Sequence, residues 1–249
     1  MNLWQVSKAE DQITPLAGLL YRLVEGQEHA ATLSLVDTLE EQVLLEDLLE
    51  QVKPPEASAY NHYHYLLRTP FRYPPLPWGS RFGRQHEPSL FYGGLSVMAV
   101  LAECAYYRFV FWQSMQGRPP KPMLRSEHTL FSAEYQCERG LQLQSQAFIA
   151  FRDMICNKSN YLAAQQLGSD MRSNNITAFE YPSARSVQPT TCIGLFSPAA
   201  FKQPKPLAMW HWVSEVGAET AAFKATEESQ VTCFRRADFC LDGTLPIPA

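Results

Sequence analysis

The first long amphipathic pattern in the chain covers residues 33–52. Its apolar residues recur at near-helical spacing, and five acidic residues occupy the other faces. This spacing predicts an amphipathic helix with an acidic surface. Lys53-Pro-Pro ends the pattern, because proline lacks the backbone N–H that a continuing helix would need.

A second segment, residues 96–112, is apolar or aromatic on almost every helical face, and Glu103 is its single acid. Ser96 is a suitable N-cap, so we expect a helix with Glu103 about two turns from its start. A carboxylate among apolar neighbours is costly unless it is paired or hydrogen-bonded. Such a group serves either chemistry or an arginine ion pair kept only for packing. Glu103 is therefore the first candidate functional residue.

The rest of the chain contains short apolar runs separated by turn signals, which predict strands. Gly93-Gly94 is expected to form a turn, residues 68–84 a proline-rich loop, and residues 60–67 a strand or a short helix. Strands mixed with helices, without regular β-α-β spacing, predict an α+β domain. The expected strands are 89–92, 142–151, 176–181, 192–196, 207–216 and 230–235, and 160–174 is expected to be a surface helix.

The composition indicates a globular chain, since 46% of its 249 residues are hydrophobic. A net charge of -4 offers no basic field, so nucleic acid is set aside as a substrate. The first residues lack a signal-peptide pattern and no apolar run is long enough to span a bilayer, so we expect a cytoplasmic protein. Six cysteines without a Cys-x-x-Cys pair fit reduced thiols, and His62 and His64 fit structural roles without a metal.

Several arginines near predicted strand ends and loops are candidates for binding a polyanion, because a guanidinium can donate two hydrogen bonds to phosphate oxygens. Taken singly, each is more often a solvated surface charge. Ser183 follows a proline, but no Gly-x-Ser-x-Gly elbow accompanies it, so a nucleophilic serine has little support. The arginines are Arg22, Arg68, Arg72, Arg81, Arg84 and Arg185, and the aromatic residues among them, which fit stacking or core packing, are Tyr73, Trp78, Phe82 and Tyr92.

Five short motifs, taken in order, resemble the RES domain family, the toxin half of RES-Xre toxin-antitoxin pairs, named for an arginine, a glutamate and a serine. Together they cover residues 19–201, and residues 210–235 also read as family-like strands. An inserted acidic helix and proline-rich loop, residues 33–80, make the early part longer than in compact members. The motifs are Leu20-Tyr-Arg22-Leu, Gly79-Ser-Arg81-Phe-Gly, Leu90-Phe-Tyr92, Leu101-Ala-Glu103 and Tyr181-Pro-Ser183-Ala-Arg185, and Cys192-Ile-Gly-Leu-Phe-Ser-Pro matches the next strand.

The resemblance implies one domain over residues 1–249, with a core at 19–240 and a fold like that of ADP-ribosyltransferases, a mixed split β-sheet flanked by helices. It implies a toxin that cleaves NAD at the nicotinamide–ribose bond, as a glycohydrolase or phosphorylase, with NAD as substrate and no cofactor or metal. An ionised glutamate would stabilise the positive ribose that forms as nicotinamide leaves. The implied catalytic residues are Glu103, Ser183 and Tyr92, and the implied NAD-binding residues are Arg22, Arg81 and Tyr21.

The partner implied by the resemblance is a protein antitoxin of the Xre type that occludes the site. Two alternatives stay open: a mono-ADP-ribosyltransferase that modifies a protein target, and a non-catalytic module that only binds an antitoxin. The second NAD-binding arginine also stays open, because Arg72 and Arg84 lie in the same loop as Arg81. The nucleophile is water, phosphate or a protein side chain.

Overall fold

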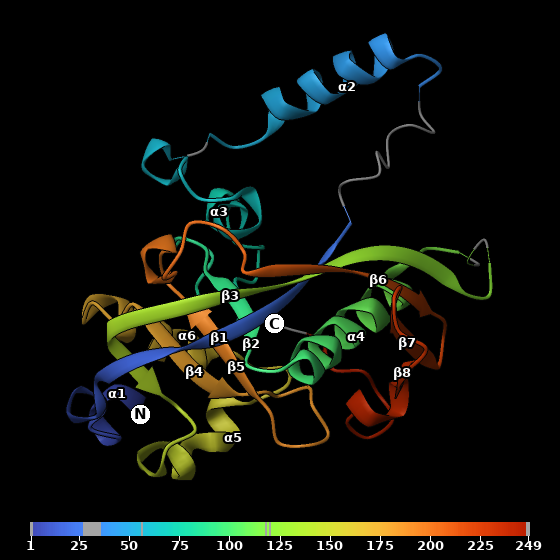
Figure 1. Cartoon of the computed structure of the whole chain (residues 1–249). Coiled ribbons are helices and arrows are strands. Elements are labelled where there is room, and N and C mark those ends of the chain that lie inside the picture. Colours follow the sequence, from blue (N-terminus) through green and yellow to red (C-terminus); the bar gives the residue numbers. More distant parts are fainter. Residues whose placement is uncertain (1, 27–35, 56, 118, 120, 248–249) are drawn as a thin grey trace.

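The computed structural model describes residues 2–26, 36–55, 57–117, 119 and 121–247, which form a single α+β domain built on a mixed sheet (Figure 1). The α+β class predicted from the sequence is therefore confirmed. The strands are β1 (Thr14–Glu25), β2 (Phe91–Gly94), β3 (Leu124–Gln142), β4 (Ala178–Pro182), β5 (Thr191–Leu195), β6 (Ala208–Val216), β7 (Thr220–Ala225) and β8 (Thr232–Arg235). The helices are α1 (Leu3–Val6), α2 (Leu39–Val52), α3 (Tyr65–Arg72), α4 (Val97–Ser114), α5 (Arg152–Ile155) and α6 (Leu162–Ser173).

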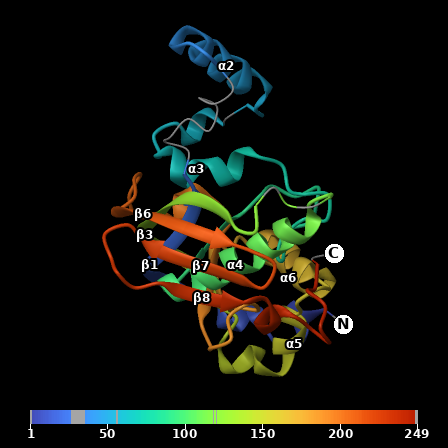
Figure 2. The ribbon, with the colours of Figure 1, turned by 90° about the vertical axis from the view of Figure 1, so that its right-hand side faces the viewer.

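The sheet closes on itself because β1 pairs with both β2 and β3. The strand order is β1-β2-β5-β4-β3-β6-β7-β8, and the additional β1–β3 pairing joins the first five strands into a ring. β3 pairs with β1 over most of its length, with β6 near its start and with β4 at its end. The β3–β4 pairing is parallel and the other pairings of the described strands are antiparallel. β6, β7 and β8 extend the sheet beyond this ring (Figure 2).

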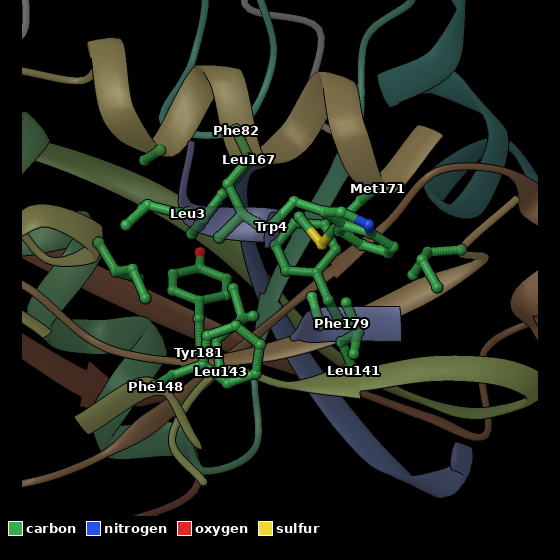
Figure 3. Packing of buried hydrophobic residues seen from close by; sticks show 14 of the residues in the cluster. Leu3, Trp4, Phe82, Leu141, Leu143, Phe148, Leu167, Met171, Phe179 and Tyr181 are labelled. Atoms are coloured by element: carbon green, nitrogen blue, oxygen red, sulfur yellow. The ribbon is translucent and has the colours of Figure 1, made fainter. Parts of the chain in front are cut away.

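One core cluster packs α6 and α1 against β4 and the end of β3 (Figure 3). Phe82 meets Phe179 and Tyr181 edge to face, with ring centroids 4.7 and 4.9 Å apart. Gly168 lets α6 approach this cluster, because a Cβ at that position would lie 1.9 Å from the Phe82 carbonyl oxygen. Aromatic packing of this kind anchors the loop that carries Arg81, the residue before Phe82.

The helix α4 begins at the predicted N-cap, where the Ser96 hydroxyl accepts a hydrogen bond from the Ala99 N–H at 3.2 Å. It packs against β1, β2 and β7. Gly94 permits the close approach to β2, because a Cβ there would lie 2.9 Å from the Cβ of Ala99. Glu103 lies about two turns into α4, as expected, and is partly buried.

The predicted acidic helix is α2, which begins at Leu39, so the expectation that it covers residues 36–38 is wrong; residues 33–35 lie outside the described residues. A reciprocal cap sets the start of this helix. The Thr38 hydroxyl accepts from the Glu41 N–H at 3.1 Å, and the Glu41 carboxylate accepts from the Thr38 N–H at 3.2 Å. α2 stands away from the sheet in two perpendicular views (Figures 1 and 2).

Two predictions of irregular structure are wrong. The first part of the proposed loop 68–84 belongs to helix α3, which is capped by His64, whose Nδ1 accepts from the Leu66 N–H at 3.3 Å. The helix ends two residues before Pro74, as the steric restriction ahead of proline requires. Gly93 and Gly94 do not form a turn but belong to β2, where they pair with β5.

The prediction of a strand at 142–151 is also wrong. β3 ends at Gln142, and residues 146–151 form a 3-10 helix that buries Phe148. β3 and β7 were not predicted, whereas β2, β4, β5, β6 and β8 lie within or overlap their expected strands. The helix expected at 160–174 is α6, but it buries one face against the core and is not simply a surface helix.

The described residues also bear on membranes, metals and disulfides. None of their helices combines the length and hydropathy needed to cross a membrane. No group of three or more His, Cys, Asp or Glu residues among them could hold a metal ion. All six cysteines are free thiols.

Candidate functional site

A cavity of about 750 Å3 lies between α4, β1, β2 and the loop over residues 76–81. It follows α4 from Ala99 to Phe111, about three helical turns or roughly 18 Å. The cavity walls hold both charged and aromatic side chains from segments far apart in the sequence. Of the residues singled out as candidates from the sequence, those that line it are Arg22, Trp78, Arg81, Tyr92 and Glu103, whereas Tyr21 and Ser183 are not part of the lining.

Glu103 is held by the turn that follows β4. The Ser183 hydroxyl donates a hydrogen bond to Glu103 Oε1 at 2.8 Å. The same hydroxyl oxygen accepts from the backbone N–H groups of Arg185 and Ser186, at 3.1 and 3.2 Å. With two donors on its oxygen, the Ser183 hydroxyl hydrogen is directed at the carboxylate. Ser183 therefore fixes the orientation of Glu103 and is not free to act as a nucleophile.

The thiol of Cys192 is a second donor beside this carboxylate. Its Sγ lies 4.0 Å from Glu103 Oε1, at the outer limit of a sulfur hydrogen bond. Burial, and then the charge of Glu103, raise the pKa of Cys192 well above its ordinary value, so the thiol keeps its proton. Among the described residues Glu103 forms no ion pair, so the alternative of an arginine pair kept for packing does not describe it.

Arg22 enters the cavity from β1. Its Nη1 donates to the Tyr92 carbonyl oxygen at 2.6 Å, and its guanidinium lies 4.7 Å from the centre of the Phe91 ring. Burial lowers the pKa of Arg22 to about 10, so the side chain is still charged at neutral pH. Its Nε is buried and has no hydrogen-bond partner among the described residues. A buried donor of this kind favours an anionic ligand.

Arg81 is fixed from the opposite wall. Its Nη1 donates to the carbonyl oxygens of Asn157 and Ile155, at 2.6 and 3.2 Å, and its guanidinium lies over the Tyr161 ring at 4.6 Å. Burial acts to lower the pKa of Arg81, but Tyr161 and Glu103 act in the opposite sense and the pKa is raised overall. Both arginines are thus charged and restrained.

The two other loop arginines are placed outside the cavity lining. Arg72 contacts Glu50 at 2.8 Å and donates to the Pro54 carbonyl oxygen at 2.5 Å. Arg84 donates to the side chain of Gln166. Of the three arginines considered for the second position, Arg81 is the one that lines the cavity.

Tyr92 and Tyr21 occupy different environments. Tyr92 lines the cavity, and its hydroxyl lies 2.8 Å from Ser80 Oγ and accepts from the Phe82 N–H at 3.1 Å. Burial raises its pKa, so it is a neutral phenol that braces the loop carrying Arg81. Tyr21 precedes Arg22 on β1, but its side chain packs against the core cluster beneath α4 and is not part of the cavity lining.

The sequence analysis did not identify Tyr161 as the side chain that supports Arg81. Tyr161 lines the cavity and accepts a hydrogen bond from Arg185 Nη2 at 3.1 Å, and Arg185 itself lies 3.5 Å over the ring of Tyr106. Arg185 was a candidate for ligand contact, yet it is buried and holds Tyr161 in place. Tyr161 gave no sequence signal, because it lies at the start of an expected surface helix with no motif around it.

The far end of the cavity contains a second polar group. His128 Nε2 lies 2.9 Å from Ser214 Oγ and 3.0 Å from Ser126 Oγ. Burial lowers the pKa of His128 to about 4, so the imidazole is neutral at physiological pH. Nearby, Arg108 forms an ion pair with Glu25 at 3.2 Å. The cavity therefore presents the Glu103 carboxylate in one part, and the His128 imidazole and the Arg108–Glu25 ion pair in another.

The arrangement suits a ligand that carries negative charge at one point and develops positive charge at another. The two arginines supply charge-assisted donors, and the oriented carboxylate supplies a negative charge within a partly water-excluded space. The Ser183 hydroxyl donates to the Glu103 carboxylate, which could act as its base, but its oxygen already accepts from two backbone N–H groups.

Comparisons with known proteins give a sequence family and a likeness to a solved structure. A family model described as "RES domain" matches residues 55–215. A search of curated proteins finds no match. The crystal structure of the M. tuberculosis MbcT-MbcA toxin-antitoxin complex contains a chain that is 10% identical, with 87% of this chain and 92% of that chain covered and a TM-score of 0.45. Arg81, Tyr92, Glu103 and Ser183 lie within the family match, and Arg22 precedes it.

Proposed function

Because the chain belongs to the RES domain family, we propose that it is a toxin enzyme that cleaves NAD at the nicotinamide–ribose bond. The observation that carries this proposal is the hydrogen bond between Ser183 and Glu103 in a cavity that also presents Arg22 and Arg81. The identity of the substrate is inferred from the family resemblance, and the geometry of the site supports the roles proposed for the residues. The products are nicotinamide and either ADP-ribose or its 1-phosphate.

In the proposed reaction the bond between the ribose anomeric carbon and the nicotinamide nitrogen breaks, and its electron pair leaves with nicotinamide. The ribose becomes oxocarbenium-like, and the Glu103 carboxylate stabilises this positive charge. Ser183 holds the carboxylate in the orientation that the reaction needs. Water then attacks the anomeric carbon and releases its proton to solvent, or inorganic phosphate attacks the same carbon through an oxygen to form the 1-phosphate. Glu103 works in its ionised form, because a neutral acid would supply no negative charge.

The two arginines would bind the pyrophosphate of NAD, and Tyr92 would lie beside the nicotinamide end. Arg22 fits this role because its buried Nε has no hydrogen-bond partner among the described residues, and Arg81 fits because Tyr161 and two carbonyl oxygens hold it rigidly. Binding energy gained at the pyrophosphate helps to orient the ribose for bond cleavage. The length of the cavity along α4 leaves space beyond Glu103 for the rest of the dinucleotide.

The test is incubation of the purified chain with NAD, with and without phosphate, followed by identification of the products. We expect nicotinamide release by the wild-type chain and release about 100- to 1000-fold slower by the Glu103→Gln variant. Labelled NAD distinguishes hydrolysis from transfer, because a mono-ADP-ribosyltransferase would leave the label on protein. Intact NAD under all conditions, with correctly folded protein, would reject the proposal.

We further propose that a protein antitoxin of the Xre type occludes the cavity. The support is the family and the partly exposed rim, where Trp78 is 47% exposed and Leu76 is 54% exposed. Co-expression with the antitoxin should restore growth and block nicotinamide release. An antitoxin that neutralises growth arrest while NAD cleavage by the complex continues would contradict occlusion.

A further inference from the structure

The helix α2 carries an apolar stripe that the described residues of the chain leave exposed. Residues four apart lie on one face of a helix, and Leu44, Leu48 and Val52 are 59%, 50% and 80% exposed. Exposed apolar patches of this kind mark interaction sites. We call this surface the α2 stripe; it consists of Leu44, Leu45, Leu48, Leu49 and Val52.

α2 lies outside the part of the chain that matches the family model, and an ion pair ties it to α3. The family match begins at residue 55, after the helix ends. The Arg72–Glu50 ion pair, at 2.8 Å, ties the C-terminal half of α2 to α3. The loop after α3 leads to Trp78 and Arg81 in the cavity wall.

The charges around the α2 stripe identify the kind of partner that fits it. α2 contains five acidic residues and no basic residue, and Lys53 follows its end. Lys53 and Arg72 already neutralise Glu50. A second copy of the helix would bring like charges together, which is destabilising. A basic partner would gain both apolar burial and complementary charge. The acidic residues that remain are Glu40, Glu41, Glu46 and Asp47.

We propose that the α2 stripe docks a basic amphipathic helix of a partner protein. The partner helix would place apolar residues on the stripe and lysine or arginine residues against the acidic faces of α2, as in other helix-in-groove interactions. The proposal does not depend on NAD cleavage, because α2 contributes no residue to the cavity lining.

The test uses a synthetic amphipathic peptide of about 18 residues, long enough to match α2, with leucine on one face and lysine on the others. Fluorescence anisotropy measures its affinity for the full chain. The Leu44→Ser/Leu48→Ser variant should bind at least about tenfold more weakly, as expected for truncated anchor residues. The matched control, Leu162→Ser/Leu207→Ser, changes two apolar residues that are exposed elsewhere and should bind like the wild type.

Further measurements distinguish binding through the α2 stripe from binding by charge alone and from self-association of the chain. A scrambled peptide of equal composition that binds as tightly would overturn the proposal. Light scattering that shows a dimer lost in Leu44→Ser/Leu48→Ser would overturn it in favour of a second copy. Glu40→Gln/Asp47→Asn keeps the stripe and should weaken binding and reduce its salt dependence; unchanged binding would contradict the basic partner. The peptide should bind Glu103→Gln normally, whatever the result with NAD.

Discussion

Replacement of Ser183 by alanine separates the positioning of Glu103 from its charge. The variant removes one charge-assisted hydrogen bond of 2.8 Å to the carboxylate. Such a bond contributes about 1.5-3 kcal/mol, which corresponds to a fall in kcat/KM of about 10- to 150-fold. Glu103 keeps its negative charge, so the loss should be smaller than the loss caused by Glu103→Gln.

The same substitution also has a predictable cost in stability. Two backbone N–H groups, of Arg185 and Ser186, lose the hydroxyl oxygen that accepts from them. At about 0.5-1.5 kcal/mol for each of the two lost bonds, and about 2-4 °C for each kcal/mol in a chain of this size, the melting temperature should fall by about 2-12 °C. Activity is therefore measured well below the melting temperature of the variant.

Initial rates of nicotinamide release from NAD provide the assay, and Ser186→Ala is the matched control. Ser186 lies in the same turn and donates through its backbone, so its side chain can be removed without loss of that bond. If Ser183 acts only through Glu103, the double variant Ser183→Ala/Glu103→Gln should lose about as much activity as Glu103→Gln alone. Ser183→Ala with activity within about twofold of wild type, or additive losses in the double variant, would refute the positioning role.

Four other expectations are open to direct measurement. Glu103→Gln should keep the fold and lower the rate of NAD cleavage by about 100- to 1000-fold, the loss expected for one electrostatic group. Arg81→Ala should weaken NAD binding by about 1.5-3 kcal/mol in calorimetry, and Arg84→Ala should not change it. Gly168→Ala should lower the unfolding free energy by at least about 1-3 kcal/mol in urea titration, because its Cβ would overlap the Phe82 carbonyl. Burial lowers the pKa of His128 to about 4 in the folded chain, below its ordinary value of about 6.5. The unfolded chain therefore binds the proton first, and the unfolding free energy should fall as pH falls from about 6.5 to about 4. His128→Gln should reduce that loss.

The elements predicted well from the sequence are those whose local signals agree with their packing. Ser96 caps α4 and the apolar run behind it is long, so both the helix and the depth of Glu103 could be predicted. Gly93 and Gly94 misled the prediction, because glycine is a turn signal locally. In the fold they serve close approach: a Cβ on Gly93 would lie 2.8 Å from the Tyr21 carbonyl oxygen.

The parts of the site that could not be predicted depend on contacts between distant segments. Tyr161 supports Arg81 only because α6 and the turn after β4 meet beside the loop 76–81. The choice of Arg81 over Arg84 could not be made from spacing either, since both lie in one loop. In the structure Phe82 packs in the core, so that its neighbour Arg81 lines the cavity and Arg84 does not.

The closed ring of strands has a consequence for the order in which the chain is made. β1 carries Arg22 and pairs with β2 and β3. Glu103 forms its hydrogen bonds with Ser183 and Cys192, which are translated much later than Glu103 itself. A ribosome-bound chain that has not passed Cys192 therefore cannot possess the complete site. Such long-range pairing is also slow to form. If the chain cleaves NAD as proposed, it is inactive throughout most of its synthesis, and the interval before activity gives a partner time to bind.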